Sequence, residues 1–235
     1  MRFRALAADY DGTLAADERV DDRTLRSLAR LRAAGHRLVL VTGRQLPHVL
    51  SAFPAVEVCD RVVAENGALL YRPDRGEERL LGPAPPAALV EELERRGVEP
   101  LGRGRVILAT HEPHGAEVAA TIRDLGLAHQ VILNKGAVMV LPPGVDKASG
   151  LAAALDELGL APGDAVGVGD AENDWAFLVT CGRSVAVANA LPALKERADL
   201  VTRGEAGEGV VELVERMLTD DLAGLDVESS QVGPR

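Results

Sequence analysis

The sequence of 235 residues has no excess of basic charge and no long apolar run. Its formal net charge is −10, which argues against a nucleic-acid-binding surface because such a surface needs a basic patch. No segment reaches the roughly 20 apolar residues that a membrane helix needs. Asp9 and Asp11 interrupt the only candidate for a signal peptide. We therefore expect a cytoplasmic protein whose partners include neither a membrane nor a nucleic acid.

Cysteine, histidine and lysine are also scarce. The two cysteines, Cys59 and Cys181, lie in apolar stretches and are expected to be reduced core residues. The five histidines are scattered, and no spacing among them suggests a zinc site. Only three of the 26 basic residues are lysines, namely Lys135, Lys147 and Lys195. Each lysine is therefore a candidate for a specific role.

What the sequence does contain is an alternation of apolar strands and amphipathic helices. Buried strands are predicted over 3–9 and 37–43, with a helix over 21–35 between them. A short helix over 47–53 and a hairpin around Asn66-Gly67 follow. The alternation resumes with helices over 147–159, 172–182, 191–198 and 209–218 and strands over 165–170, 184–190 and 199–202. This pattern predicts an α/β fold with a doubly wound, Rossmann-like parallel sheet.

Two proline-containing stretches, 81–87 and 142–144, interrupt this alternation. Between them the pattern predicts two helices and three strands, enough for a small α+β domain inserted at 82–145. The core domain would then consist of two separate segments, 1–81 and 146–218. The tail over 219–235 is polar and without periodicity, so we expect it to be disordered.

Polar side chains follow the predicted strands at their carboxyl ends, where open parallel sheets bind ligands. They are Asp9, Asp11, Thr42, Lys147, Asp170 and Asp174. Carboxylates suit Mg²⁺, and a lysine and a threonine can donate to a phosphoryl group. Asp9, Asp170 and Asp174 would balance Mg²⁺ and Lys147, which leaves room for a phosphate dianion. Asp11 fits this balance best when protonated, as a general acid must be.

Each of these residues also has a simpler interpretation. Asp11-Gly12 is a common turn dipeptide, Thr42 could cap a helix, and Lys147 could be a surface residue. An EF-hand is excluded because Gly12 comes at the fourth position of the loop, after a strand. A receiver-type domain would be shorter and lack an insert, and a glycosyltransferase would need a nucleotide-binding half. A non-catalytic protein that binds a phosphorylated ligand stays open.

Four motifs together resemble those of the haloacid dehalogenase (HAD) superfamily of phosphatases. They are DYDGTL at 9–14, VTGR at 41–44, GVDK at 144–147 and GDAEND at 169–174. The insert between the second and third motifs resembles the α/β cap of type II members, and so does ENGA at 65–68. Within that branch the chain is similar to Cof-type sugar phosphatases, to the sucrose-phosphate phosphatase-like group and to archaeal-type phosphoglycolate phosphatases.

The resemblance implies a role for each matching residue. Asp9 would be the nucleophile that forms an aspartyl-phosphate, and Asp11 would protonate the leaving alcohol and then activate water. Thr42, Gly43 and Lys147 would bind the phosphoryl oxygens. Mg²⁺ would be held by the set Asp9, Asp11, Asp170 and Asp174, with Asp11 contributing its backbone carbonyl. Further contacts are implied for Arg44, Asn66 and Asn173.

The expected function is Mg²⁺-dependent hydrolysis of a small phosphomonoester such as a sugar phosphate or a phosphoglycolate-like acid. A phosphotransferase or phosphomutase-like enzyme on the same fold is the alternative. We expect specificity to come from the insert, with Arg103, Arg105, His111, Asn134 and Lys135 as the candidate residues. A monomer or a small homo-oligomer is compatible with the sequence.

Overall fold

The computed structural model describes residues 2–223, and two sheets are present in that range. The strands of the larger sheet are β1 Ala5–Ala8, β2 Arg37–Val41, β3 Arg61–Ala64, β4 Leu69–Arg72, β5 Glu77–Leu80, β10 Ala165–Gly169, β11 Arg183–Ala186 and β12 Leu200–Val201. Their order is β12-β11-β10-β1-β2-β3-β4-β5. Neighbours from β12 to β3 pair in parallel, whereas β3 with β4 and β4 with β5 pair antiparallel.

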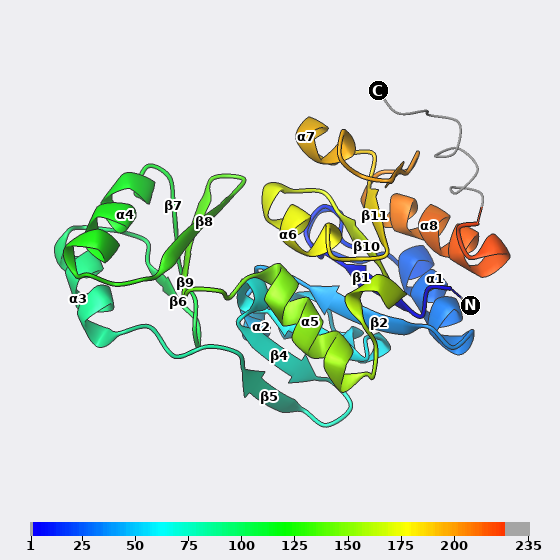
Figure 1. The fold of residues 1–235 in the computed structure, drawn as a ribbon, viewed down its shortest axis with the longest axis horizontal. Coiled ribbons are helices and arrows are strands. Elements are labelled where there is room, and N and C mark those ends of the chain that lie inside the picture. Colours follow the sequence, from blue (N-terminus) through cyan, green and yellow to red (C-terminus); the bar gives the residue numbers. More distant parts are fainter. Residues whose placement is uncertain (1, 224–235) are drawn as a thin grey trace.

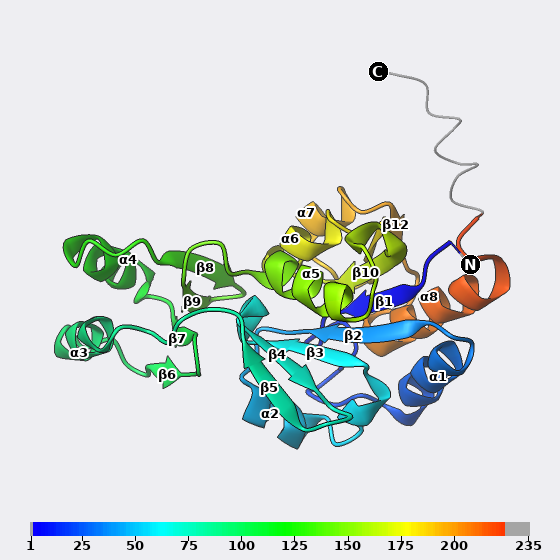
Figure 2. The ribbon, with the colours of Figure 1, turned by 60° about the horizontal axis from the view of Figure 1, so that its bottom comes forward.

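Helices cover both faces of this sheet, as a doubly wound fold requires (Figure 2). One face carries α1 Asp22–Ala33, α2 Leu46–Ala52 and α8 Ala206–Asp220. The other carries α5 Lys147–Glu157, α6 Trp175–Leu178 and α7 Pro192–Lys195. The central strand β1 lies between β10 and β2. Because the chain leaves β1 and β10 in different directions, their carboxyl ends border a crevice, which is where such sheets bind ligands.

The second sheet belongs to residues 82–145, which we call the insert. Its elements are α3 Ala87–Arg95, β6 Gly102–Arg103, β7 Leu108–His111, α4 Gly115–Asp124, β8 Gln130–Asn134 and β9 Ala137–Leu141, with strand order β6-β7-β9-β8. Figure 1 shows these elements together at one end of the molecule. Leu89, Leu93, Val118 and Val138 are among the buried residues of a hydrophobic cluster within the insert. The insert has four strands in the described residues, whereas the sequence predicts three, because β6 is too short to give a periodic pattern. The boundaries proposed for the two domains stay a prediction.

The C-terminal region differs from the prediction. Helix α8 continues through Thr219 and Asp220, and Leu222 is buried against the main core with 2 % of its surface exposed. The prediction of disorder from residue 219 onward is therefore wrong for 219–223, because the apolar face of α8 and the side chain of Leu222 extend the core. The rest of the predicted tail, 224–235, lies outside the described residues. The predicted helix over 172–182 is shorter, consisting of a 3₁₀ turn at Glu172–Asp174 followed by α6.

Two smaller expectations concern cysteines and membranes. Within the described range Cys59 and Cys181 are both free. Cys59 is buried and Cys181 half-buried. Over residues 2–223, none of the helices combines the length and the apolar character needed to cross a bilayer.

The antiparallel edge of the large sheet is tied to α5 by a single carboxylate. Glu157, whose side chain is 11 % exposed, accepts a hydrogen bond from Arg61 at 2.9 Å and two from Arg72 at 2.7 and 2.9 Å. Arg79 of β5 lies 3.4 Å away. The hydrogen bond from Arg72 is the largest influence on Glu157 and lowers its pKa from 4.5 to about 2.

We expect Glu157→Gln to destabilise the protein by about 1 kcal/mol at pH 7. The folded pKa is below the unfolded one, so this contribution is complete above pH 4.5 and is lost as the pH falls toward 2. Urea unfolding at pH 7 and pH 3 measures the effect, and the difference from wild type should shrink at pH 3. Glu77→Gln is the control, because Glu77 is half exposed and pairs with Arg72 alone. An equal loss at both pH values would contradict the argument.

Candidate active site

A buried lysine joins two buried aspartates at the centre of the crevice. The Nζ of Lys147 donates to Oδ1 of Asp9 and to Oδ1 of Asp174, both at 2.6 Å. The three side chains are at most 6 % exposed. Three ionisable groups so far from water persist only when paired and hydrogen-bonded, so this triad is either a structural ion network or a site.

Local structure explains why Lys147 points inward. It is the first residue of α5, whose N-cap, Asp146, forms a capping box with Ser149. The helix start is pressed against the turn at Gly67, where a Cβ would lie 1.8 Å from the carbonyl oxygen of Asp146. Gly67 also has φ +106°, a conformation that disfavours other residues. The motif GVDK therefore sets both the start of the helix and the direction of its lysine.

The turn after β10 holds the other carboxylates. Oδ2 of Asp174 accepts the backbone N–H groups of Asp170 at 2.8 Å and Ala171 at 2.9 Å. Asp170 accepts a hydrogen bond from the hydroxyl of Thr13 at 3.4 Å and one from Nζ of Lys135 at 2.6 Å. Asp174 thus uses both oxygens within the protein, one for the turn and one for Lys147.

Burial and mutual repulsion shift the protonation of these groups. Burial, with the nearby Asp174 carboxylate, raises the pKa of Asp9 to about 8 against the opposing attraction of Lys147. Burial also raises the pKa of Asp170, and its hydrogen bond from Lys135 opposes that shift. Burial disfavours the charge on Lys147, but Asp174 and Asp9 outweigh it and raise the lysine pKa. Such a site binds an additional cation favourably, because negative charge is only partly compensated.

The donor set fits a small, hard cation. Carboxylate oxygens of Asp9, Asp170 and Asp174 lie within 4.8 Å of one another, and all three residues are buried. Among the described residues, no donor is bonded to Oδ2 of Asp9. Asp170 is engaged by a lysine that is half exposed and belongs to the insert. Asp9 and Asp170 thus have oxygen lone pairs available for Mg²⁺, whereas both oxygens of Asp174 accept hydrogen bonds, one from Lys147 and one from two backbone N–H groups.

Asp11 lies outside that cluster and pairs with Arg44. Nε of Arg44 lies 2.8 Å from Oδ2 of Asp11, and Nη2 lies 2.6 Å from Oδ1. The guanidinium stacks 5.0 Å from the ring centre of Tyr10 and lies 3.7 Å from Glu18. Asp11 itself is half exposed. Its carboxylate is therefore bonded to Arg44 and does not belong to the cluster of Asp9, Asp170 and Asp174.

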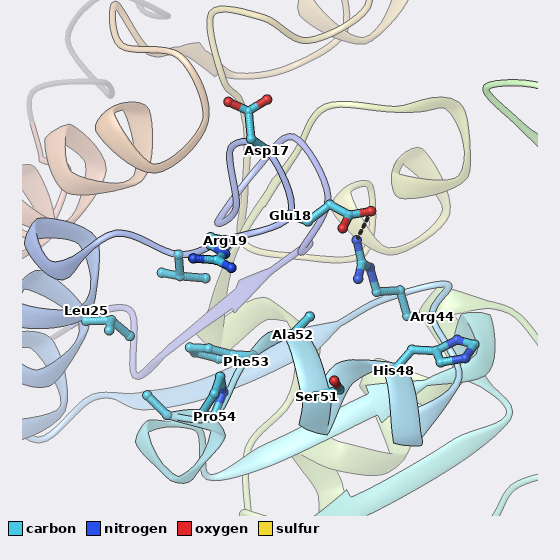
Figure 3. Close-up of a pocket in the computed structure, with 12 residues that line it drawn as sticks. Asp17, Glu18, Arg19, Leu25, Arg44, His48, Ser51, Ala52, Phe53 and Pro54 are labelled. Atoms are coloured by element: carbon cyan, nitrogen blue, oxygen red, sulfur yellow. Dashed lines mark ion pairs between the residues drawn. The ribbon is translucent and has the colours of Figure 1, made fainter.

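Arg44 also lines a surface cavity of about 820 Å³ between the loop at 17–20 and helix α2. Figure 3 shows the Glu18 carboxylate reaching the Arg44 guanidinium at the rim of this cavity. The residues described as lining it include His48, Ser51 and Phe53 but none of the clustered carboxylates. The cavity is therefore distinct from the aspartate cluster, although Arg44 touches both the cavity and Asp11.

The second motif ends in a packed turn. Thr42 is fully buried, and its hydroxyl oxygen accepts the N–H of Arg44 at 3.1 Å. A Cβ at Gly43 would lie 3.6 Å from the sulfur of Met139 in the insert. Asn173 donates to Asn66 at 2.9 Å, and both are buried. The structure therefore brings these predicted residues to one edge of the sheet.

The insert residues divide into two groups. Lys135, in the turn between β8 and β9, reaches Asp170, and Asn134 is its half-buried neighbour. Figure 1 shows the β8–β9 hairpin pointing from the insert toward α6. Arg103 pairs with Glu94, Arg105 lies 3.4 Å from Glu78, and both arginines line a separate cavity of about 330 Å³. His111 is exposed at the end of β7.

The sequence interpretation overlooked three residues at this edge. Thr13 touches Asp170, and Asn189 donates to the carbonyl of Gly12 at 2.8 Å. Asn189 follows strand β11, so inspecting every strand end would have found it. Glu65 lies at the border with the insert and is fully buried. Glu65 lies in the ENGA motif, but a contact was implied only for Asn66 of that motif.

Gly12 shows how tightly the first motif is built. It has φ +82°, and a Cβ there would lie 2.3 Å from Oδ2 of Asp170. Only glycine fits that close approach. The first and fourth motifs therefore touch, although 157 residues separate Thr13 from Asp170.

Comparisons with known proteins agree with this geometry. The family model of haloacid dehalogenase-like hydrolases matches residues 6–83 and 107–214. A phosphoglycolate phosphatase of Methanothermobacter thermautotrophicus is 32 % identical over 224 residues, covering 92 % of this chain and 99 % of the relative. A phosphoglycolate phosphatase of Haloarcula marismortui is 33 % identical over 217 residues, covering 89 % of this chain and 95 % of the relative.

Solved structures share the fold. A haloacid dehalogenase-like hydrolase from Bacteroides thetaiotaomicron superposes with a TM-score of 0.76 at 21 % identity, covering 92 % of this chain and 99 % of that one. A HAD subclass IIB sugar phosphatase superposes with a TM-score of 0.75 at 19 % identity, covering 91 % of this chain and 98 % of that one. The family match spans the strands and turns that carry the aspartates and Lys147. This chain therefore belongs to the family of haloacid dehalogenase-like hydrolases.

Proposed function

We propose that this protein is a Mg²⁺-dependent phosphatase that hydrolyses a small phosphomonoester through an aspartyl-phosphate on Asp9. The observation that carries the proposal is the buried Asp9–Lys147–Asp174 triad beside Asp170, with one oxygen of Asp9 left without a donor in the described structure. Oδ2 of Asp9 is not among the fully buried polar atoms that lack a partner, so it keeps some exposure instead of being sealed inside an ion network. An oxygen held in place but unused is what a nucleophile needs.

The chain's own residues then account for both steps. The unused oxygen of Asp9 forms a bond to phosphorus while the bond from phosphorus to the alcohol oxygen breaks, and Asp11 gives that oxygen its proton. Arg44 neutralises the Asp11 carboxylate that results. Asp11 next takes a proton from a water molecule, which attacks phosphorus and releases phosphate and Asp9. Lys147 and Thr42 bind the phosphoryl oxygens during transfer.

Asp9 and Asp170 would hold Mg²⁺, together with the backbone carbonyl of Asp11. When bound, the cation neutralises phosphoryl charge and leaves the second oxygen of Asp9 free. Asp174 supports the site by orienting Lys147 and the turn that carries Asp170.

The direct test is a phosphatase screen over sugar phosphates, phosphoglycolate and nucleotides, with Mg²⁺ and with EDTA. We expect phosphate release with Mg²⁺ and its loss with EDTA. Ca²⁺ should bind and inhibit, because it accepts bidentate carboxylates and would engage both oxygens of Asp9. Activity that persists in EDTA, or that is equal with either metal, would contradict this mechanism.

The substrate is a small molecule with an anionic or hydroxylated leaving group. Lys135 supports this, because it lies at the crevice. Burial lowers its pKa, but the hydrogen bond to Asp170 and the charges of Asp170, Asp9 and Asp174 together outweigh burial and raise it. When Asp170 binds Mg²⁺, the Lys135 ammonium can meet a carboxylate or hydroxyl of the leaving alcohol. A phosphorylated hydroxy acid such as phosphoglycolate, the substrate named for the relatives above, fits this arrangement.

Lys135→Met is expected to lower kcat/KM for phosphoglycolate by about 10- to 100-fold. Hydrolysis of p-nitrophenyl phosphate should change little, because its aromatic leaving group carries neither the carboxylate nor the hydroxyl group that the ammonium is proposed to bind. Arg105→Gln is the matched control, since Arg105 is 68 % exposed and pairs with Glu78 and not with the clustered aspartates. Equal losses for both esters in the Lys135 variant would rule out this role.

A further inference from the structure

Glu65 is a buried carboxylate whose partners all lie in the insert. It is 1 % exposed and accepts the backbone N–H groups of Arg105 at 2.8 Å, Val106 at 2.8 Å and Ile107 at 3.1 Å. Within residues 2–223, no cationic side chain is bonded to it. The three amides therefore supply the compensation that a buried charge requires.

The same turn is fixed to the catalytic edge on its other sides. The N–H of Glu65 donates to the carbonyl of Arg44 and that of Asn66 to the carbonyl of Thr42, both at 2.9 Å. Asn66 also accepts a hydrogen bond from Asn173. Glu65 and Asn66 have φ values of +51° and +55°, which are unfavourable for these residues and persist only where surrounding contacts impose them. The turn at Glu65–Gly67 is thus a rigid base for the catalytic loops.

A short path of strand pairing leads from Glu65 to the Lys135 turn. The segment 105–107 that Glu65 holds runs directly into β7, which pairs with β9 from Leu108 opposite Val140 to His111 opposite Ala137. The turn with Lys135 immediately precedes β9. Val106 and Ile107 also pack with Met139 and with Ala68, on the core side. The position of the start of β7 therefore sets the position of β9, and with it the position of Lys135 relative to Asp170.

We propose that Glu65 is a positioning residue for hydrolysis. It fixes the insert to the catalytic edge so that Lys135 stands over Asp170 when substrate binds. Closure of the insert is then a movement about a fixed contact at 105–107, rather than a free swing on two linkers. The proposal rests on the proposed function for its effect on turnover, while the anchor itself is independent of that function.

The anchor is tested by hydrogen–deuterium exchange in Glu65→Gln. Glutamine has the same shape, but its NH₂ group replaces one of the two carboxylate oxygens. That NH₂ group cannot accept the hydrogen bonds that the replaced oxygen accepts from the backbone N–H groups. Exchange of the amides at 105–107 should accelerate at least about tenfold. Glu78→Gln removes an exposed carboxylate beside Arg105 of the same segment and should leave exchange unchanged. Unchanged exchange in Glu65→Gln would overturn the proposal.

Kinetics separates positioning from a general loss of structure. In Glu65→Gln we expect kcat/KM for phosphoglycolate to fall about tenfold or more, and that for p-nitrophenyl phosphate to fall less than about threefold. Equal losses for both esters would overturn the positioning role. A wild-type protein that hydrolyses no phosphomonoester would overturn the proposed function instead, and the exchange result would still decide whether Glu65 is an anchor.

A second variant guards against misfolding of the first. A Cβ at Gly104 would lie 2.7 Å from Oε1 of Glu65 and 2.6 Å from a methyl of Ile107. Gly104→Ala therefore keeps the carboxylate but displaces it from its amides. It should reproduce the faster exchange at 105–107 and the selective loss toward phosphoglycolate. A Gly104→Ala protein identical to wild type in both measurements would overturn the proposal.

Discussion

Asp9→Asn is expected to lower phosphatase turnover by at least about 10³-fold without destabilising the protein. The amide cannot form an acyl phosphate, so the covalent step is lost. Stability should be retained, because burial raises the pKa of Asp9 to about 8, and the folded protein thus resists its charged form. An amide oxygen can still accept the hydrogen bond from Lys147.

Two measurements check this expectation. Acid-quenched protein should retain phosphoryl label from substrate in the wild type and not in Asp9→Asn. The melting temperature of the variant should equal or exceed that of the wild type, as active-site substitutions often allow. Asp60→Asn is a suitable contrast, because Asp60 is buried but bonds to Leu38 and Arg37, away from the crevice. It should lose stability and keep its labelling. Near-normal turnover in Asp9→Asn would refute the nucleophile assignment.

Lys147→Met should abolish activity and also destabilise the fold by about 3–5 kcal/mol. Its ammonium lies 2.6 Å from both Asp9 and Asp174, and its removal leaves two buried carboxylates facing each other without compensation. The loss of a cation that binds the phosphoryl oxygens should alone reduce turnover by about 10²–10³-fold.

The double variant Asp9→Asn/Lys147→Met separates the two effects. Removing one carboxylate together with the lysine should restore most of the stability but none of the activity. Lys195→Met is the control, because Lys195 is a half-buried lysine that donates only to the carbonyl of Ala188 at 2.8 Å. Urea unfolding and phosphate release report the two quantities. A double variant no more stable than Lys147→Met would show that repulsion between the carboxylates is not the cause.

The buried parallel strands and the catalytic edge were predictable because both follow from local patterns. Each buried strand of the parallel part is a run of apolar residues, and the polar residue after it marks its carboxyl end. Strand β5 was not predictable, since all four of its residues are exposed and the sequence EERL has no alternation of apolar and polar residues. Its position depends on pairing with β4 and on Arg79 near Glu157.

The site was predictable at the core and much less so at the insert. Asp9, Lys147 and Asp170 lie in three of the four motifs, so their meeting at one edge was predictable, whereas their roles in hydrolysis stay a proposal. Lys135 was only one of several polar residues near insert turns, because its distance to Asp170 depends on how two sheets are oriented. Glu65 lies in the ENGA motif, but its role as an anchor could not be predicted, since its partners lie about 40 residues away and are backbone amides, which any sequence provides.

The two ends of the insert meet at one point. A Cβ at Gly82 would lie 3.3 Å from Pro142 and from Val145, so the chain leaves and re-enters the large sheet at the same place. Closing a loop costs an entropy that grows only with the logarithm of its length, about 0.6 kcal/mol per doubling. An insertion at this point can therefore be lengthened, shortened or exchanged at little cost to the sheet beneath it. The residues proposed for catalysis lie on the large sheet, and those proposed for specificity lie in the insert. The two sets can therefore change at different rates during evolution.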